Sequence, residues 1–475
     1  MAIGLWLISC KTESSTPPPP SQQPPSIRTT GLDLEQIRQR GKLVALTDNS
    51  STSYFIYKGR PMGYEYDLLH WLAQSLEVEL EIIVVQDMDD IFDDLNNKLG
   101  DIVAANITVT KERSERVAFT EHHLFTPQVL VQRLPQNARR LKSHQIERKL
   151  IRNPIELAGK TIHVRKNSSF FTRLEHLSDE IGAPINIVKV PGDVETEQLI
   201  EMVAKGEIEF TIADHNVARL SQIYYSNLDI RTKVSFPQRI AWAVRKDSPE
   251  LKSAIDAWII EHRGSSEYVT IYNKYFRSRK AHKRRVWSDY SSLAGGKISE
   301  FDELIRRYSE EVGWDWRLMA SLIYQESQFN PDARSWTGAS GLMQVLPETA
   351  MQYKVDSTQL MEPEPNIVAG ARLIKRLTSY WNEHLSDSLE VPKFVLASYN
   401  VGLGHIIDAQ RLAEKYGADP NRWEDNVAIY LKQKSLPKFY NDPVVKFGYC
   451  RGAEPFKYVK EVLQRYQHYT NSIDL

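Results

Sequence analysis

The stretch DWRLMASLIYQESQFNPDARSWTGASGLMQVLPETA, residues 315–350, decides the fold of the C-terminal part of the chain. Asp315 is a favourable N-cap for a helix, and Pro331 keeps the residue before it out of helical geometry. The apolar residues that precede Glu326 by eight, seven, four and three positions share its face of this helix: Leu318, Met319, Leu322 and Ile323. The stretch therefore predicts an amphipathic helix with a carboxylate near its end.

A carboxylate at the end of an apolar stripe is unusual, because burying its charge is costly. The expected response is a raised pKa, which keeps the carboxyl group protonated near neutral pH. A protonated carboxyl is what a general acid needs to donate a proton to a glycosidic oxygen. The alternative for Glu326 alone is a helix-rim residue in a salt bridge.

Three further motifs follow Glu326-Ser327 along the chain. They are Gly341-Leu342-Met343-Gln344, Tyr399-Asn400 with Gly402, and Tyr458-Val459. In this order the four motifs closely resemble the C-terminal domain of the lytic transglycosylases, a lysozyme-like family. The resemblance implies an all-α fold and cleavage of peptidoglycan between MurNAc and GlcNAc, with a 1,6-anhydro product.

The same resemblance implies roles for individual residues. Glu326 is expected to act as the sole catalytic acid and base, because the C6 hydroxyl of the muramic acid replaces water as the nucleophile. The expected substrate-binding residues are Ser327, Gly341, Met343, Gln344, Tyr399, Asn400 and Tyr458. Hydrolysis as in lysozyme stays open through Asp332, although Asp332 and Glu348 are expected to be loop or helix-start carboxylates.

Strand and helix patterns alternate upstream of this region, from about residue 34. We expect strands at Lys42–Leu46, Val78–Val85, Asp101–Ala105, Thr161–Val164, Ile185–Val190 and Glu209–Ile212, and helices at Tyr66–Leu76 and Glu197–Lys205. Such alternation favours α/β units with mostly parallel sheets. A break near residues 130–155 predicts two lobes. Strand patterns end after residue 298, where helical periodicity takes over.

Several motifs in residues 34–275 resemble the family 3 periplasmic solute-binding proteins. They include Gly63-Tyr64-Glu65-Tyr66-Asp67-Leu68, the segment from Thr108 to Arg113, Ser168-Ser169, and Ala213-Asp214. The resemblance implies that Arg113 binds a ligand carboxylate and Asp214 an α-ammonium, with Ser169 and Thr108 beside them. Guanidinium suits carboxylate because two parallel N–H bonds match its geometry. Surface salt bridges are the alternative for both residues.

The N-terminal residues suggest an anchored protein. Cys10 closes a short apolar run in a pattern that resembles a lipoprotein box, and a chance cysteine is the alternative. Residues 11–30 are rich in proline and polar residues, which predicts an extended tether. No segment approaches the ~20 apolar residues of a spanning helix. Residues 277–297 carry a basic run, either a solvated linker or a contact with anionic wall polymer or lipid.

Length and composition agree with a multi-domain soluble protein. The net charge of -1 gives no drive toward nucleic acid, and no cofactor or metal is expected. We expect His122 and His123 to lie in a surface loop. The predicted parts are a lipoprotein signal (1–10), a tether (11–33), a solute-binding-protein-like domain (34–276), a basic linker (277–297) and a lytic transglycosylase domain (298–475).

Taken together, the two resemblances match the membrane-bound lytic transglycosylase F family. They predict an enzyme with a regulatory domain that binds an amino acid or muropeptide. The expected location is the periplasmic side of the bacterial outer membrane, with the protein either peripheral or held by a lipid anchor. The alternative is a wall-anchored binding protein whose lysozyme-like domain is inert. The desolvated acid at Glu326 favours the enzyme, because a pure anchor has no need for one.

Overall fold

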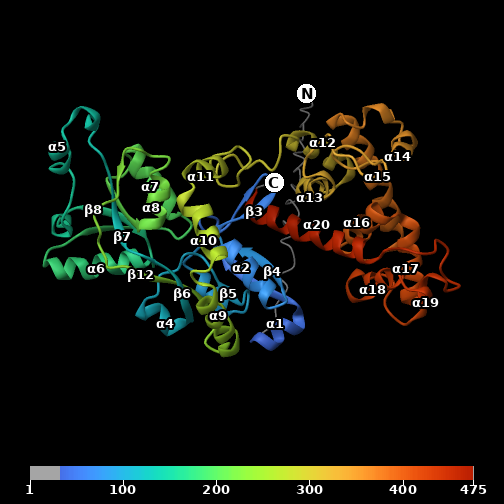
Figure 1. Ribbon diagram of the computed structural model, residues 1–475, viewed down its shortest axis with the longest axis horizontal. Coiled ribbons are helices and arrows are strands. Elements are labelled where there is room, and N and C mark those ends of the chain that lie inside the picture. The colour runs from blue at the N-terminus through green and yellow to red at the C-terminus, as the bar shows by residue number, and fades with distance from the viewer. Residues whose placement is uncertain (1–32, 474–475) are drawn as a thin grey trace, which may run out of the picture.

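A computed structural model describes residues 33–473, arranged as a two-lobed α/β domain followed by an all-α domain (Figure 1). The lipid-attachment prediction for Cys10 lies outside these residues. Figure 1 shows the two lobes and the helical domain in a row, with the first lobe in the middle. The predicted fold class, a bilobal α/β domain followed by an all-α domain, is confirmed.

The first lobe is built on a five-stranded sheet with the order β4-β1-β5-β12-β6. Strands β1, β4 and β5 run parallel, and β12 pairs antiparallel with both β5 and β6. The strands are β1 (Lys42–Thr47), β4 (Glu79–Val84), β5 (Ile102–Val103), β6 (Ala118–Thr126) and β12 (Gln238–Val244). The helices are α1 (Leu34–Arg40), α2 (Tyr64–Ser75), α3 (Ile91–Asn96), α4 (Lys111–Arg116), α9 (Pro249–His262) and α10 (Ser266–Tyr272). A hairpin of β2 (Phe55–Tyr57) and β3 (Arg60–Met62) leaves this lobe toward the helical domain.

The second lobe carries a sheet with the order β11-β7-β10-β8-β9. Its strands are β7 (Gln128–Arg133), β8 (Thr161–Arg165), β9 (Asn186–Val190), β10 (Phe210–Asp214) and β11 (Leu228–Asp229). Its helices are α5 (Ser143–Glu147), α6 (Ser169–Ile181), α7 (Thr196–Lys205) and α8 (His215–Ser221), with 3-10 turns at Ala138–Arg140 and Pro154–Leu157. The chain enters this lobe between β6 and β7, and it returns before β12.

The crossing between the lobes differs from the sequence prediction. It falls at Pro127, between β6 and β7, rather than within residues 130–155. The strands next to both crossings pair antiparallel, so the sheets are mixed rather than mostly parallel. The surface loop predicted for His122 and His123 is also wrong: both lie in β6, and His123 is buried. Two adjacent histidines in a strand point to opposite faces, so one of them enters the core.

The segment after the α/β domain is partly folded rather than a plain linker. A π-helical turn at Asn273–Arg277 leads into α11 (Arg279–Val286). His282 and Arg285 are buried there, and the Arg285 guanidinium donates to the carbonyl of Lys274. The basic run therefore has one side packed on the first domain.

The helical domain follows residue 298. Its helices are α12 (Asp302–Val312), α13 (Trp316–Ser327), α14 (Pro347–Gln352), α15 (Pro363–His384), α16 (Val391–Val401), α17 (Leu403–Lys415), α18 (Ala428–Gln433), α19 (Pro437–Tyr440) and α20 (Ala453–Ser472). A 3-10 turn lies at Ser357–Gln359 and a π-helical turn at Trp423–Val427. The core between α12, α13, α15, α16 and α20 surrounds the predicted catalytic helix α13.

Helix α20 belongs to both domains. It packs along α13 and α16, and its last turns contact β4 and β2 of the first lobe. The Tyr54 hydroxyl and His468 Nδ1 lie 2.6 Å apart, and Asn471 donates to the carbonyl of Ile82 at 3.1 Å. A helix shared in this way holds the first lobe against the helical domain. Of the helices in residues 33–473, none has the length and apolar character needed to span a membrane.

Candidate functional site

Glu326 lies in the last turn of α13, where the local sequence fixes both ends of the helix. The Asp315 carboxylate accepts a hydrogen bond from the backbone N–H of Arg317, which is a regular N-cap. The helix ends at Ser327 because Gln328 and Phe329 have φ values of 53° and 61°. The four apolar residues that share the Glu326 face are all buried. Their packing on the core leaves Glu326 half-buried at the rim.

One phenol contacts the Glu326 carboxyl group. The Tyr458 hydroxyl, brought in by the second turn of α20, donates to Glu326 Oε1 at 2.5 Å. Burial raises the pKa of Glu326 to about 7, and the hydrogen bond from Tyr458 opposes that shift. A carboxyl group with a pKa near 7 can both give and accept a proton at neutral pH. This is the behaviour expected of a group that serves as acid and then as base.

The turn that carries Gly341 and Gln344 is held from behind. Gly341 has φ 80°, and a Cβ there would lie 2.1 Å from the carbonyl oxygen of Leu360. Asn366 on α15 donates to the carbonyls of Ser340 and Leu360 and accepts from the N–H of Met343. Gly341 is thus required because Leu360, just before α15, and Asn366, on α15, lie too close to this turn for a side chain there.

Met343 and Gln344 stabilise the same turn in different ways. The Met343 side chain is buried against Gly370, and its carbonyl accepts a hydrogen bond from the Tyr399 hydroxyl at 2.7 Å. The Gln344 amide donates to the carbonyls of Ala333 and Gly341. Tyr399 thereby ties α16 to the turn. Burial raises the pKa of Tyr399, and the nearby Glu326 charge adds to the rise, so the two groups share one environment.

Ser327 and Asn400 differ in what they can offer a ligand. The Ser327 hydroxyl donates to the carbonyl of Ile323 within the helix, and the side chain is buried. Asn400 is exposed at the end of α16. Asp332 and Glu348 are also exposed. Neither contributes to the raised pKa of Glu326, which is set by burial and by the hydrogen bond from Tyr458. Within the described residues, no second carboxylate contacts Glu326.

Sequence reasoning missed the residues that join α13 to the first lobe. The Arg60 guanidinium, at the start of β3, donates to the Tyr324 hydroxyl at 2.6 Å and to Gln328 Oε1 at 2.5 Å. Tyr324 and Gln328 both lie two positions from Glu326. No local signal could have paired residues 264 positions apart. Trp336, in the turn after α13, is 95% exposed, which the sequence did not predict.

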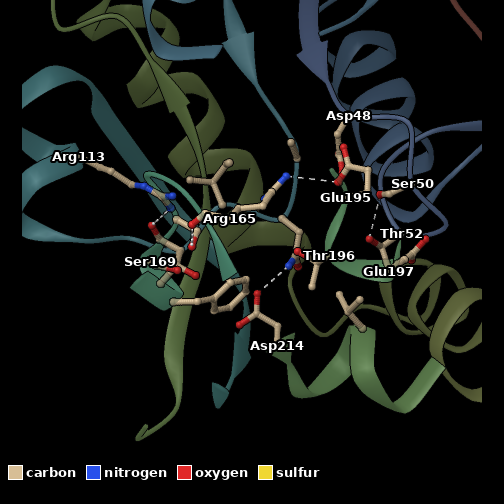
Figure 2. A pocket seen from close by; sticks show the side chains of 17 residues that line it. Asp48, Ser50, Thr52, Arg113, Arg165, Ser169, Glu195, Thr196, Glu197 and Asp214 are labelled. Carbon is tan, nitrogen blue, oxygen red and sulfur yellow. Dashed lines mark hydrogen bonds and ion pairs between the residues drawn. The ribbon is translucent and has the colours of Figure 1, made fainter. Parts of the chain in front are cut away.

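The solute-binding residues predicted from the sequence line one pocket between the two lobes (Figure 2). Thr108 and Arg113 come from the first lobe, and Ser169 and Asp214 come from the second. Arg113 donates to the carbonyl of Thr108 at 3.0 Å and to that of Asn167 at 3.4 Å. Both acceptors are backbone carbonyls, so no carboxylate neutralises Arg113 by direct contact in the described chain.

Asp214 sits at the end of β10 and is 3% exposed. Its Oδ2 accepts from the Asn106 amide at 3.0 Å, while Oδ1 has no hydrogen bond from any of residues 33–473. Burial raises the pKa of Asp214 to about 7, against the attraction of the Asn106 amide and Arg113. The arrangement can accept a group that is positive at one point and negative at another.

The pocket also contains charged residues that the sequence did not single out. Asp48, Glu195 and Glu197 gather at the end away from Arg113 and Ser169, and Arg165 reaches toward them from the middle of the pocket (Figure 2). They come from the end of β1, the end of β8 and the start of α7. The alternation of strands and helices predicts that strand ends meet near a ligand. A single sequence does not show which of the many acidic residues do so.

Two family models match the chain. The model for bacterial extracellular solute-binding proteins, family 3, matches residues 43–278, and the transglycosylase SLT domain model matches residues 303–421. A protein of Desulfosudis oleivorans named membrane-bound lytic murein transglycosylase F is 35% identical over 439 residues, which cover 91% of each chain. The chain belongs to the membrane-bound lytic murein transglycosylase F family.

Other relatives match this chain over most of their length. The family members of Photobacterium profundum and Stutzerimonas stutzeri are 32% and 31% identical, over 92% and 91% of this chain and 81% and 86% of their own. Among solved structures, a mutant of ArgBP from T. maritima is 24% identical and covers 52% of this chain and 99% of its own, with a TM-score of 0.43. The predicted membership of the transglycosylase F family is confirmed.

Proposed function

We propose that this chain cleaves the glycan strands of peptidoglycan as a lytic transglycosylase, with Glu326 as its only catalytic acid and base. The observation that carries the assignment is a half-buried carboxyl group whose pKa is about 7 and whose one side-chain partner among residues 33–473 is a phenol. Membership of the transglycosylase F family supports the same reaction.

The proposed reaction needs no water. Protonated Glu326 donates to the oxygen that bridges MurNAc C1 to GlcNAc, and the C1–O bond breaks. The Glu326 carboxylate then accepts the proton of the MurNAc C6 hydroxyl, whose oxygen forms a bond to C1. The carboxyl group ends as it began, and the product is a 1,6-anhydro sugar. Intramolecular attack has a large proximity advantage over attack by water.

The remaining predicted residues have distinct proposed roles. Tyr458 orients the carboxyl group through its hydrogen bond, and Asn400 contacts the glycan because its amide is exposed. Gly341, Met343 and Gln344 form the turn that Tyr399 ties to α16, and this turn binds substrate mainly through its backbone. Ser327 closes the helix end that carries the acid.

Mass analysis of digested peptidoglycan tests the reaction class. Muropeptides lacking one water identify 1,6-anhydromuramic acid and support the proposal. Products that carry reducing ends alone would overturn it in favour of hydrolysis. An inert helical domain, the second candidate, requires that no soluble product appear at all.

We further propose that the N-terminal pocket binds a zwitterionic effector and that binding alters cleavage. Arg113 and Asp214 line one pocket and form no direct ion pair with each other. Arg113 can therefore bind a ligand carboxylate, and Asp214 a ligand ammonium group. The loop from Asp48 to Ser53 borders this pocket and leads straight into the β2–β3 hairpin, whose Arg60 contacts α13. A change at the pocket can therefore reach the helix that holds Glu326.

Calorimetry and rate measurements test this regulatory role on the full chain. Free amino acids and muropeptides are titrated first, and the ligand that binds is then added to a glycan-cleavage assay. The expected coupling is modest, ~1–3 kcal/mol, because the ligand acts only through its preference between domain arrangements. A bound ligand that leaves the cleavage rate unchanged would show that the first domain only spaces the enzyme from its anchor.

The protein acts in the bacterial cell envelope, as its family implies. We propose a finer location, on the periplasmic side of the outer membrane with a lipid on Cys10. The support is the lipoprotein-like sequence around Cys10 and the proline-rich residues that follow. Labelling with a fatty-acid probe should mark the wild type and not Cys10→Ala. Equal labelling of both proteins would mean that the motif is accidental.

A further inference from the structure

The charges in the interlobe pocket do not balance for a neutral amino acid. Four carboxylates line it, from Asp48, Glu195, Glu197 and Asp214, against two guanidinium groups, from Arg113 and Arg165. Arg113 and Asp214 together match the carboxylate and ammonium of an amino-acid head. The far end then holds three carboxylates and one guanidinium group, which is an excess of two negative charges when all are ionised.

Among these groups, Asp48 gives the strongest indication of a ligand that donates a hydrogen bond. It ends β1 facing the pocket and is 7% exposed. Its Oδ1 accepts no hydrogen bond from the described part of the chain. Burial raises the pKa of Asp48, while hydrogen bonds from Ser53 and Ser50 and the charge of Arg165 oppose the rise, so the free pocket holds this carboxylate at a cost that these groups only partly offset. A buried acceptor without a donor calls for a donor from a ligand.

The two glutamates at the start of α7 face the same end. Glu195 forms an ion pair with Arg165 at 3.3 Å, so the one guanidinium group at this end is already engaged. Burial raises the pKa of Glu195 to about 8, and the charges of Asp48 and Glu197 add to the rise. Glu197 accepts the Ser51 hydroxyl at 2.5 Å across the gap between the lobes. Burial also raises its pKa. Burial is the largest cause of each of these shifts, and the neighbouring carboxylates add to it.

The ends of the pocket are separate in space. Figure 2 shows Arg113 and Ser169 on one side, Asp48, Glu195 and Glu197 on the other, and Arg165 between them. A ligand held by its amino-acid head at Arg113 and Asp214 thus directs its side chain toward the three carboxylates. Phe170 and Val217 add apolar contacts to the lining, which suit an aliphatic stem.

We propose that this pocket selects an α-amino acid whose side chain ends in a cationic group, with Asp48 and Glu195 as the specificity-determining residues. The inference rests on the proposed role of Arg113 and Asp214 in binding a zwitterion. The cation supplies a partner for Asp48 Oδ1 and relieves the repulsion among the three carboxylates. A ligand with a neutral side chain leaves these carboxylates desolvated and without a cation. This penalty contributes more to the preference for a cationic ligand than the new ion pair itself.

Two sources supply this chemistry: free dibasic amino acids, and diamino acids released from wall peptides. Calorimetry on the full-length protein separates them with L-lysine, L-ornithine and meso-diaminopimelate, against L-norleucine as the neutral analogue. L-Lysine should bind ~10–100-fold more tightly than L-norleucine, as expected for a hydrogen-bonded charge. Diaminopimelate carries a carboxylate beside its distal ammonium, so tighter binding of it than of lysine would assign the wall as the source and contradict selection for a side chain that ends in a cation alone.

Asp48→Asn keeps the shape of the side chain and removes its charge. It should lower the affinity for L-lysine about 10-fold and leave that for L-norleucine unchanged or higher. Glu201→Gln is the matched control, because Glu201 lies on α7 but outside the pocket and pairs with Lys205 at 2.7 Å. It should bind L-lysine as the wild type does, and thermal melts establish that both variants fold.

The outcomes that overturn the proposal are distinct from those that overturn the zwitterion site. If L-norleucine binds as tightly as L-lysine and Arg113→Ala abolishes both, the head-group site stands and the cation selection is wrong. If none of the amino acids binds the wild type, both proposals fall.

Discussion

Within the part of the chain that the structure describes, Glu326 in the helical domain contacts one phenol, whereas Asp48, Glu195 and Glu197 in the first domain face one another and one arginine. Both regions raise carboxyl pKa values by burial, to about 7 for Glu326 and about 8 for Glu195. In the helical domain burial acts without a neighbouring charge. In the pocket, neighbouring carboxylates add to it.

The difference in neighbours separates two uses of a buried acid. A lone carboxyl group with a pKa near neutrality exchanges its proton readily, which suits chemistry on a neutral glycan. In a cluster of carboxylates each negative charge disfavours the next, and a bound cation removes that repulsion, which suits recognition of a cation. The four predictions below test this contrast.

Glu326→Gln should have the largest effect. The amide keeps the shape of the side chain but has no transferable proton, so glycan cleavage should fall by about 10²–10⁴-fold or more. Folding and glycan binding should be nearly unchanged. Turnover of purified peptidoglycan measures the effect, and Glu348→Gln, at an exposed position on α14, is the control. A Glu326→Gln protein with a third of wild-type activity would show that another residue is the acid.

Arg113→Ala should abolish most amino-acid binding while sparing the enzyme. Loss of a charged hydrogen-bond donor to the ligand carboxylate should weaken binding by roughly 10–150-fold. Calorimetry measures the change. Arg116→Ala is the matched control, because Arg116 lies on the same helix α4 and pairs with the exposed Asp93 instead. Equal binding by the two variants would exclude Arg113 from the site.

The raised pKa of Glu326 predicts a pH-dependent stability cost. The folded-state pKa, about 7, exceeds the ordinary value of 4.5, so the folded state binds more protons between these limits and stability falls as pH rises through them. Glu326→Gln removes this cost and should stabilise the protein by ~1–2 kcal/mol at pH 8, with little effect at pH 4. Denaturant titrations at both pH values measure it. A difference between variant and wild type that does not change with pH would contradict the raised pKa.

Tyr458→Phe should have the smallest effect and a specific signature. Without the hydroxyl donor the pKa of Glu326 rises further, so the alkaline limb of the pH–rate profile moves to higher pH. The rate at the optimum should fall about 5-fold, the equivalent of one hydrogen bond. Tyr399→Phe is the comparison, because its hydroxyl donates to the Met343 carbonyl and should leave the limb in place. A limb that stays in place in Tyr458→Phe would mean that the hydrogen bond does not tune the acid.

Much of the architecture could be predicted from the sequence, because its signals are local. Hydrophobic periodicity gave the strand at residues 42–46 and the helix at residues 197–205 nearly as they are. The strands flanking Pro127 escaped prediction, because their antiparallel pairing depends on segments more than 70 residues away. Local patterns report which residues alternate, and they do not report the partner strand.

By itself the sequence determined the position of Glu326 on an apolar helix face, the order of the motifs around it and the family to which the chain belongs. Only the tertiary structure brings Tyr458 to that carboxyl group and Arg60 to the same helix. It alone assembles Asp48 and the α7 glutamates into one acidic end of the pocket. Helical spacing follows from backbone geometry within a few residues, whereas these contacts depend on how whole elements pack. The return of α20 across both domains is the clearest case.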